Sequence, residues 1–146
     1  MITWDRPLVY TGGTFDLFHY GHVSFLHQCS RFGNVVVVLN SDEFVERFKG
    51  SAPIVTLTER ILVVSGCKWV KRCIANRYDE DSASMIEEVS PEIVCVGSDW
   101  ARKDYYKQMG FTQDWLDERC ITLAYVPYTS GVRSSDLRLR LATREA

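Results

Sequence analysis

The chain has 146 residues, of which 46% are hydrophobic and 25% are charged, and these values are typical of one soluble globular domain. Its 17 basic and 19 acidic residues give a net charge of −2, so no broad positive field attracts nucleic acid. No apolar run approaches the roughly 20 residues of a membrane-spanning helix, and the first residues lack the pattern of a signal peptide. We therefore expect a single domain over residues 1–146, located in the cytoplasm, without a nucleic-acid or membrane partner.

Cysteine usage agrees with a reducing compartment. The five cysteines are an odd number, no two form a C-x-x-C pair, and four lie in or beside apolar segments, where reduced cysteine behaves as a small buried hydrophobe. We expect reduced structural thiols at all five positions, which are Cys29, Cys67, Cys73, Cys95 and Cys120.

Apolar runs and segments with helical spacing alternate along the chain. Runs typical of buried strands occupy residues 7–11, 34–40, 70–75, 92–97 and 121–127. Helices are predicted over residues 21–33, 56–66, 81–91 and 134–142, the second of them opening with Thr56 and Glu59 in capping-box spacing. Residues 98–120 form a long aromatic and charged segment that we expect to be irregular. The alternation predicts an α/β fold with a Rossmann-like, doubly wound parallel sheet of about five strands and helices on both faces.

The connection between the first strand and the first helix carries the chemistry. Residues 10–22 read YTGGTFDLFHYGH, with two of the three histidines of the chain three positions apart. Gly12 and Gly13 allow the backbone to approach a ligand, and the helix start offers unpaired N–H groups to an anion. Gly21 leaves room for a phosphate between His19 and His22. Two imidazoles at such a helix end suit the stabilisation of negative charge during phosphoryl or nucleotidyl transfer.

Two other interpretations of this segment remain open on the residues alone. Glycine-rich turns between strands and helices are common, and a histidine near a helix start can cap the helix or face solvent. A zinc site built from His19 and His22 is also conceivable, although no Cys or His cluster completes it.

Motifs along most of the chain resemble the cytidylyltransferase family, and within it the glycerol-3-phosphate cytidylyltransferases. GTFDLFHYGH, at residues 13–22, resembles the signature G-T-F-D-x-x-H-x-G-H. Four further segments resemble later family motifs in the same order: NSDEF at 40–44, KGSAPIVTLTER at 49–60, VGSDW at 96–100 and YTSGVRSSDL at 128–137.

The resemblance implies a reaction: a phosphorylated small molecule such as glycerol 3-phosphate attacks the α-phosphorus of a nucleoside triphosphate, with CTP favoured, and pyrophosphate leaves. It implies catalytic roles for His19, His22, Lys49 and Arg60. It also implies a divalent ion, usually Mg²⁺, which neutralises the charge of the triphosphate, and we assign no protein ligand to this ion. Without the resemblance, Lys49 and Arg60 would be interpreted as solvated surface cations.

Binding residues are implied in the same way. The nucleotide-binding set comprises Gly12, Gly13, Thr14, Phe15, Gly21, Asp99, Trp100, Thr129, Gly131, Arg133, Ser134 and Ser135. A substrate contact is implied for Asp16. Arg102, Lys103 and Lys107 lie in a segment that is longer than in the family, and they are candidates for holding the phosphate of the acceptor. Each has a simpler alternative: Asp16 can form a turn, Trp100 can close the core, Ser134 can cap a helix, and Arg102 and Lys103 can be solvated.

The chain also departs from the family pattern. Tyr128 replaces an arginine, Arg133 replaces a hydroxyl residue, and Ser98 replaces an acidic residue. We hypothesise that Arg133 restores the positive charge missing at position 128. These departures leave the acceptor substrate open.

Three alternative functions follow from these observations. After the CTP-dependent enzyme, the next preferred function is an adenylyltransferase that uses ATP. A non-catalytic nucleotide sensor of the same fold is third in preference, although the intact histidine pair argues against it. An aminoacyl-tRNA synthetase of the class with a related histidine signature needs a tRNA-binding module for which 146 residues leave no room. The family resemblance also suggests a homodimer.

Overall fold

The computed structural model describes residues 5–98, 105–127 and 133–145. It contains a five-stranded parallel sheet in the order β3-β2-β1-β4-β5, with every neighbouring pair parallel. The strands are β1 (Leu8–Gly13), β2 (Asn34–Leu39), β3 (Arg72–Ala75), β4 (Ile93–Gly97) and β5 (Thr122–Val126). The predicted fold class is therefore confirmed, and the strand order reverses between β1 and β4, where such sheets bind ligands.

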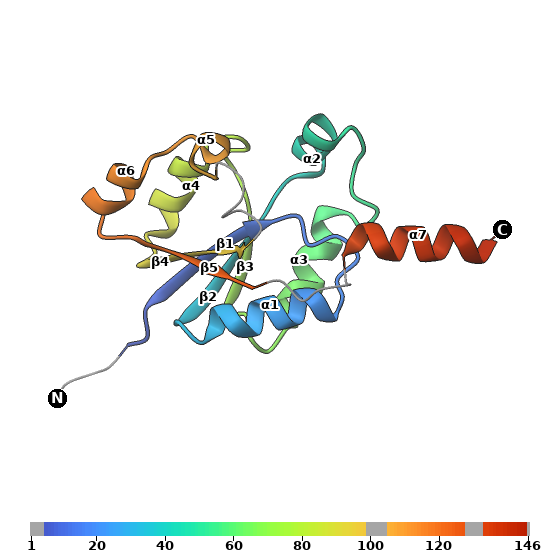
Figure 1. Cartoon of the computed structure of the whole chain (residues 1–146), viewed down its shortest axis with the longest axis horizontal. Coiled ribbons are helices and arrows are strands. Elements are labelled where there is room, and N and C mark those ends of the chain that lie inside the picture. Colours follow the sequence, from blue (N-terminus) through green and yellow to red (C-terminus); the bar gives the residue numbers. More distant parts are fainter. Residues whose placement is uncertain (1–4, 99–104, 128–132, 146) are drawn as a thin grey trace.

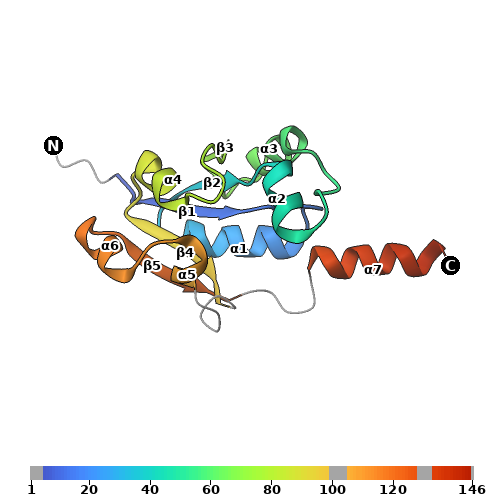
Figure 2. The ribbon, with the colours of Figure 1, turned by 90° about the horizontal axis from the view of Figure 1, so that it is seen from above.

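Helices cover both faces of the sheet (Figures 1 and 2). They are α1 (Tyr20–Ser30), α2 (Asp42–Lys49), α3 (Leu57–Ser65), α4 (Ser82–Val89), α5 (Tyr105–Met109), α6 (Gln113–Glu118) and α7 (Ser134–Glu145). Helices α1 and α3 pack on one face, and α4 and α6 pack on the other. Helix α7 extends away from the sheet. Within the described ranges, no helix combines the length and apolar character that crossing a membrane requires.

Strand β2 shows why the apolar runs form buried strands. Val35 and Val37 belong to the core cluster under α1 and α3, whereas Val36 and Val38 belong to the cluster under α4 and α6. Successive side chains of a strand point to opposite faces, so a strand covered on both sides needs apolar residues at every position.

Helix α2 was not predicted, although its signals are present. Ser41 caps it by accepting a hydrogen bond from the Phe44 N–H, and Gly50 ends it in the left-handed region with φ of 86°. The capping box of Thr56 and Glu59 was predicted for α3 and is confirmed.

The prediction of an irregular segment over residues 98–120 is wrong for its second half, which forms α5 and α6. Thr112 caps α6 by accepting from the Trp115 N–H, and the Phe111 and Trp115 rings stack with centroids 5.2 Å apart. Phe111 is buried in the core cluster under α4 and α6, so these aromatic residues serve packing.

Gly33, between α1 and β2, offers a test of the fold. A Cβ at this position would lie 2.0 Å from the carbonyl oxygen of Pro7. We expect Gly33→Ala to lower the free energy of unfolding by about 1–3 kcal/mol, because the clash is with backbone. Urea unfolding measures this. Gly66→Ala is the control, since its Cβ would meet nothing closer than 3.4 Å; equal stability of the two variants would contradict the prediction.

Candidate active site

His19 and His22 sit at the amino end of α1 and cap it reciprocally. His19 Nδ1 accepts a hydrogen bond from the Gly21 N–H at 3.1 Å, and His22 Nδ1 accepts from the His19 N–H at 3.3 Å. The capping interpretation is therefore correct for one nitrogen of each ring. Because Nδ1 accepts in both rings, the proton of each neutral imidazole lies on Nε2.

The two rings form a compact pair at this helix end. Their centroids are 3.9 Å apart, and the His22 ring also lies 5.1 Å from Phe15 and 5.4 Å from Phe18. His19 Nε2 is buried and has no hydrogen-bond partner in the described part of the chain. Buried polar atoms in native proteins are nearly always satisfied, so a donor without a described protein partner is a candidate for contact with water or a bound ligand.

Burial keeps both histidines neutral. Burial, helped by the neighbouring His19 and opposed by the Asp16 carboxylate, lowers the pKa of His22 to about 4. Burial also lowers the pKa of His19, opposed by Asp136 at the start of α7. Near neutral pH the pair therefore offers two N–H donors at the positive end of a helix rather than two imidazolium ions.

Asp16 fixes the loop between β1 and α1. It is only 5% exposed, and its carboxylate accepts hydrogen bonds from the N–H groups of Ile54 and Val55, both at 2.9 Å, and from Arg138 at 2.5 Å. Burial alone would raise the pKa of Asp16, but the two backbone N–H groups and Arg138 outweigh it and lower the pKa. Both oxygens are thus committed within the chain, which gives Asp16 a positioning role; direct substrate contact stays a prediction.

Arg60 is a buried clamp, so its interpretation as a solvated surface cation is wrong. Only 1% of the residue is exposed, and its guanidinium donates to the carbonyls of Val55, Thr14 and Asn40 at 2.8–3.0 Å and to the Asp42 carboxylate at 2.6 Å. These four bonds give Arg60 a positioning role, because they hold the loop and the start of α2 in place; its catalytic role stays a prediction.

Helix α7 reaches the same loop from the far end of the chain. The Ser134 hydroxyl donates to the Asp16 carbonyl at 2.6 Å across 118 residues of sequence, and Arg138 one turn later binds the Asp16 carboxylate. Arg133 and Ser135 are exposed beside them. The structure thus brings the predicted Ser134 next to the histidine loop.

Two residues of this network, Arg138 and Asp42, were absent from the predicted site. Arg138 could have been found, because it lies four positions after Ser134 and therefore on the same face of a helix. Asp42 lies within the NSDEF motif but carried no assigned role.

The loop itself is conformationally strained. Phe15 and Leu17 have φ of 52° and 50°, in the left-handed region that favours glycine. A Cβ on Gly13 would come within 2.9 Å of the Phe15 ring, so a side chain at this position would have to displace that ring. Lys49, at the end of α2, is exposed, and Thr14 is half-buried with its carbonyl bound to Arg60.

Some predicted positions cannot be placed in this geometry. The residues outside the described ranges are Asp99, Trp100, Arg102, Lys103, Thr129 and Gly131, together with the departure at Tyr128. Among the described residues, no group of three or more His, Cys, Asp or Glu side chains is arranged to hold a metal ion.

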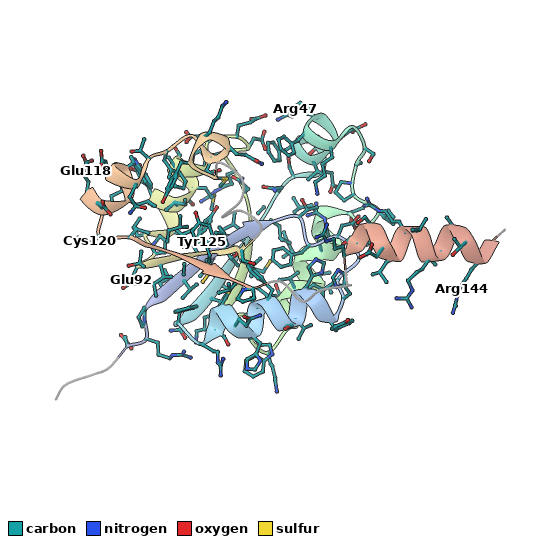
Figure 3. All side chains as sticks on the ribbon, in the orientation of Figure 1. Arg47, Glu92, Glu118, Cys120, Tyr125 and Arg144 are labelled. Atoms are coloured by element: carbon teal, nitrogen blue, oxygen red, sulfur yellow. The ribbon has the colours of Figure 1, made fainter. Side chains whose placement is uncertain are left out.

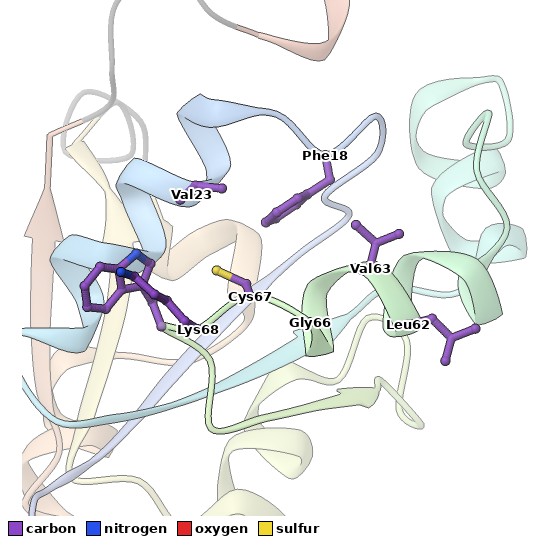
Figure 4. A pocket seen from close by; sticks show the side chains of 8 residues that line it. Phe18, Val23, Leu62, Val63, Gly66, Cys67 and Lys68 are labelled. Atoms are coloured by element: carbon purple, nitrogen blue, oxygen red, sulfur yellow. The ribbon is translucent and has the colours of Figure 1, made fainter.

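Two apolar hollows lie near the loop. One of about 480 Å³ lies between α1 and α3, with Phe18 and Cys67 among its lining residues (Figure 4). A second, of about 360 Å³, is lined by Leu17, Val63 and Leu137 among others. Neither is lined by a histidine, so we locate the site by its polar groups: the helix end, the buried Nε2 and the strained loop.

A parallel sheet that reverses order beside a histidine-capped helix end, with a second helix start bound to the same loop, defines an α/β protein with a candidate phosphate-binding site at the switch point of its sheet. The comparison of sequences shows the family. Residues 10–140 match the cytidylyltransferase-like family, and the chain belongs to that family.

Individual relatives agree with this assignment. The chain is 36% identical over 103 residues to the bifunctional protein HldE of Campylobacter curvus, covering 68% of this chain and 22% of that protein. It is 35% identical over 92 residues to an FAD synthase of Thermococcus sibiricus, covering 62% of each. The chain thus spans about a fifth of HldE and less than two thirds of the FAD synthase.

Solved structures show the same fold. A lipopolysaccharide core biosynthesis protein from Thermoplasma volcanium superposes with a TM-score of 0.67 at 27% identity, covering 84% of this chain and 96% of that one. A pantothenate synthetase from Thermus thermophilus, at 12% identity and a TM-score of 0.61, shares the fold alone, over 97% of this chain and 65% of that one.

The low pKa of His22 predicts a pH dependence of stability. Between its ordinary value of 6.5 and the folded value of about 4, the unfolded chain binds a proton that the folded chain excludes, so stability falls as the pH falls through this window. We expect His22→Asn to weaken this dependence, as measured by urea unfolding at pH 7 and pH 5. His27→Asn, at an exposed position of the same helix, should keep the wild-type dependence. Identical pH profiles for wild type and His22→Asn would contradict the assignment.

Proposed function

We propose that the chain transfers a nucleoside monophosphate, CMP from CTP as the favoured case, to a phosphorylated small molecule such as glycerol 3-phosphate. The observation that carries this proposal is the buried, unpartnered Nε2 of His19 at the amino end of α1. A buried donor at a positive helix end suits a phosphate oxygen whose negative charge grows during the reaction.

The chemistry needs no covalent enzyme intermediate. A phosphate oxygen of the acceptor attacks the α-phosphorus, a new P–O bond forms, and the bond to the bridging oxygen of pyrophosphate breaks. The Nε2–H groups of His19 and His22 stabilise the charge that develops on the α-phosphate and on the leaving group. Positioning and charge stabilisation account for catalysis of this type.

The remaining residues hold the triphosphate in this proposal. Backbone N–H groups from Gly12 to Phe15 and the start of α7 at Ser134 and Ser135 bind phosphate oxygens, while Lys49 and Arg133 supply positive charge. Asp99 and Trp100 contact the base and ribose. Arg60 and Asp16 act indirectly, because their polar atoms hold the loop. Mg²⁺ would enter with the triphosphate, whose charge it neutralises.

ATP is the second candidate nucleotide, and one comparison favours it. The Thermococcus relative is named as an FAD synthase, and FAD contains an adenosine. A sensor that binds nucleotide without turnover is the remaining alternative.

A pyrophosphate-release assay tests the function. CTP and ATP are each paired with a panel of phosphorylated polyols and sugars, and we expect turnover with CTP. His19→Ala should lower kcat by about 10²–10³, because it removes a hydrogen-bond donor to the transition state. The loss of thermal stability should not exceed what the loss of one helix cap causes. His27→Ala serves as the control. Turnover with ATP alone would select the second candidate, and nucleotide binding without any turnover would select the sensor.

We further propose that the protein is a homodimer, with α7 contributing contacts. None of residues 134–144 is buried, and Leu139 and Leu141 are 65% and 57% exposed. A helix of 12 residues has marginal stability by itself, so a second copy that covers these leucines would stabilise it.

Light scattering in solution tests the dimer. The wild type should have twice the mass of one chain, and the double variant Leu139→Glu, Leu141→Glu should be monomeric. Phe32→Glu, at a 42% exposed position at the other end of α1, should remain dimeric. A monomeric wild type would refute the proposal.

A further inference from the structure

Strands β1 and β4 stop pairing before either of them ends. Their register closes with the pair of Tyr10 and Val94, and residues 11–13 of β1 have no partner in residues 95–97 of β4, all of which the structure describes. Both strands stay paired with their other neighbours, β2 and β5, to their last residues. We call this separation the strand split, and it lies where the strand order reverses, the position at which sheets of this kind bind ligands.

Tyr10 lies at the start of the strand split, and its side chain extends toward the carboxyl end of β1. A Cβ placed on Gly12 would lie 3.2 Å from the Tyr10 hydroxyl oxygen and 3.5–3.7 Å from two carbons of the ring. The ring therefore occupies the space that a side chain on Gly12 would fill, and Gly12 is itself exposed. The hydroxyl thus lies beside the strand split, on the face of the sheet that α4 and α6 cover.

The Tyr10 hydroxyl has no hydrogen-bond partner in the described part of the chain, although only 2% of the residue is exposed. Buried tyrosine hydroxyls usually find a partner, because an unpaired one loses its bonds to water without replacement. Burial raises the pKa of Tyr10 above its ordinary range, so the hydroxyl stays protonated and can both donate and accept. Like His19 Nε2, it is a candidate for contact with water or a bound ligand.

The position of this hydroxyl corresponds to one part of a nucleotide. In the proposed function the triphosphate lies at the loop that begins at Gly12, and the base takes the side of β4. The ribose joins these two parts, so it lies beside the strand split. A neutral hydroxyl binds phosphate less strongly than a cation does, whereas it matches a ribose hydroxyl, which also both donates and accepts.

We infer that the Tyr10 hydroxyl binds a hydroxyl of the ribose, which makes Tyr10 a specificity residue for ribonucleotides. This inference rests on the proposed function, because that function places a nucleotide at the switch point of the sheet. The hydroxyl is unpaired in the free protein and gains its hydrogen bond in the complex. A deoxynucleotide that lacks the matching group leaves the Tyr10 hydroxyl unpaired, and sites built on a hydrogen bond discriminate strongly against such ligands.

Calorimetric titration of Tyr10→Phe tests the contact, because this variant removes the hydroxyl and keeps the ring. CTP and ATP are each titrated without an acceptor, so that no transfer occurs. We expect Tyr10→Phe to raise the Kd of the nucleotide that the wild type binds about tenfold, the value of one well-formed hydrogen bond. Tyr125→Phe is the control and should bind like the wild type, since it removes a hydroxyl from β5, at a 40% exposed position where the pairing with β4 is unbroken (Figure 3).

Deoxynucleotides separate ribose recognition from a general effect on binding. The 2′-deoxy and 3′-deoxy forms of the same nucleotide each lack one ribose hydroxyl. We expect the wild type and Tyr125→Phe to bind one of these forms about tenfold more weakly than the ribonucleotide, and Tyr10→Phe to bind the two about equally. An unchanged preference in Tyr10→Phe, or an equal loss of affinity for all three nucleotides, would overturn the inference.

The melting temperature distinguishes ribose binding from a packing role. An unpaired buried hydroxyl costs free energy in the folded protein, so Tyr10→Phe should leave the melting temperature unchanged or raise it. A lower melting temperature together with wild-type preference among the three nucleotides would make Tyr10 a structural residue and contradict the inference.

Failure of the proposed function gives a distinct result. If binding of the ribonucleotide weakens in Tyr10→Phe while no acceptor releases pyrophosphate, the ribose contact stands and the transfer reaction fails. If pyrophosphate is released while Tyr10→Phe keeps the wild-type Kd and preference, the reaction stands and the ribose contact fails. A wild type that binds neither CTP nor ATP would reject both.

Discussion

The buried guanidinium of Arg60 is the interaction on which the site depends. It joins Thr14 after β1, Asn40 after β2, Val55 before α3 and Asp42 at the start of α2. A buried charge is tolerated when it is paired and fully hydrogen-bonded, and Asp42 with three carbonyls meets that condition. Arg60 thereby fixes the carboxyl ends of two neighbouring strands, β1 and β2, relative to each other, and the histidine loop follows the first of them.

Asp16, like Arg60, holds the loop between β1 and α1 in place. Its carboxylate holds residues 54 and 55 by their N–H groups and α7 by Arg138. These bonds offset the strain of the left-handed conformations at Phe15 and Leu17. The result is a rigid turn that presents the histidine pair before any ligand arrives, and such preorganisation is what charge stabilisation in a transition state requires.

The sheet order divides the crevice into two halves with different chemistry. The reversal between β1 and β4 puts the histidine loop at its centre. Residues 40 and 76 follow β2 and β3 on one side, and the carboxyl end of β4, at Gly97, lies on the other. In our proposed function the base and ribose of the nucleotide take the side of β4.

The sequence by itself determined the strands, the parallel α/β fold and the histidine-bearing helix end, because each depends on local apolar runs, periodicity and glycine positions. Helices α2, α5 and α6 were missed, although Ser41 and Thr112 mark two of their starts. Only the tertiary structure decided that Arg60 is a clamp, that Asp16 anchors α7 and that Asn40 meets Asn76. Most of these contacts join residues far apart in the chain, up to 122 positions between Asp16 and Arg138. They arise from strand order and register, which local pattern does not encode.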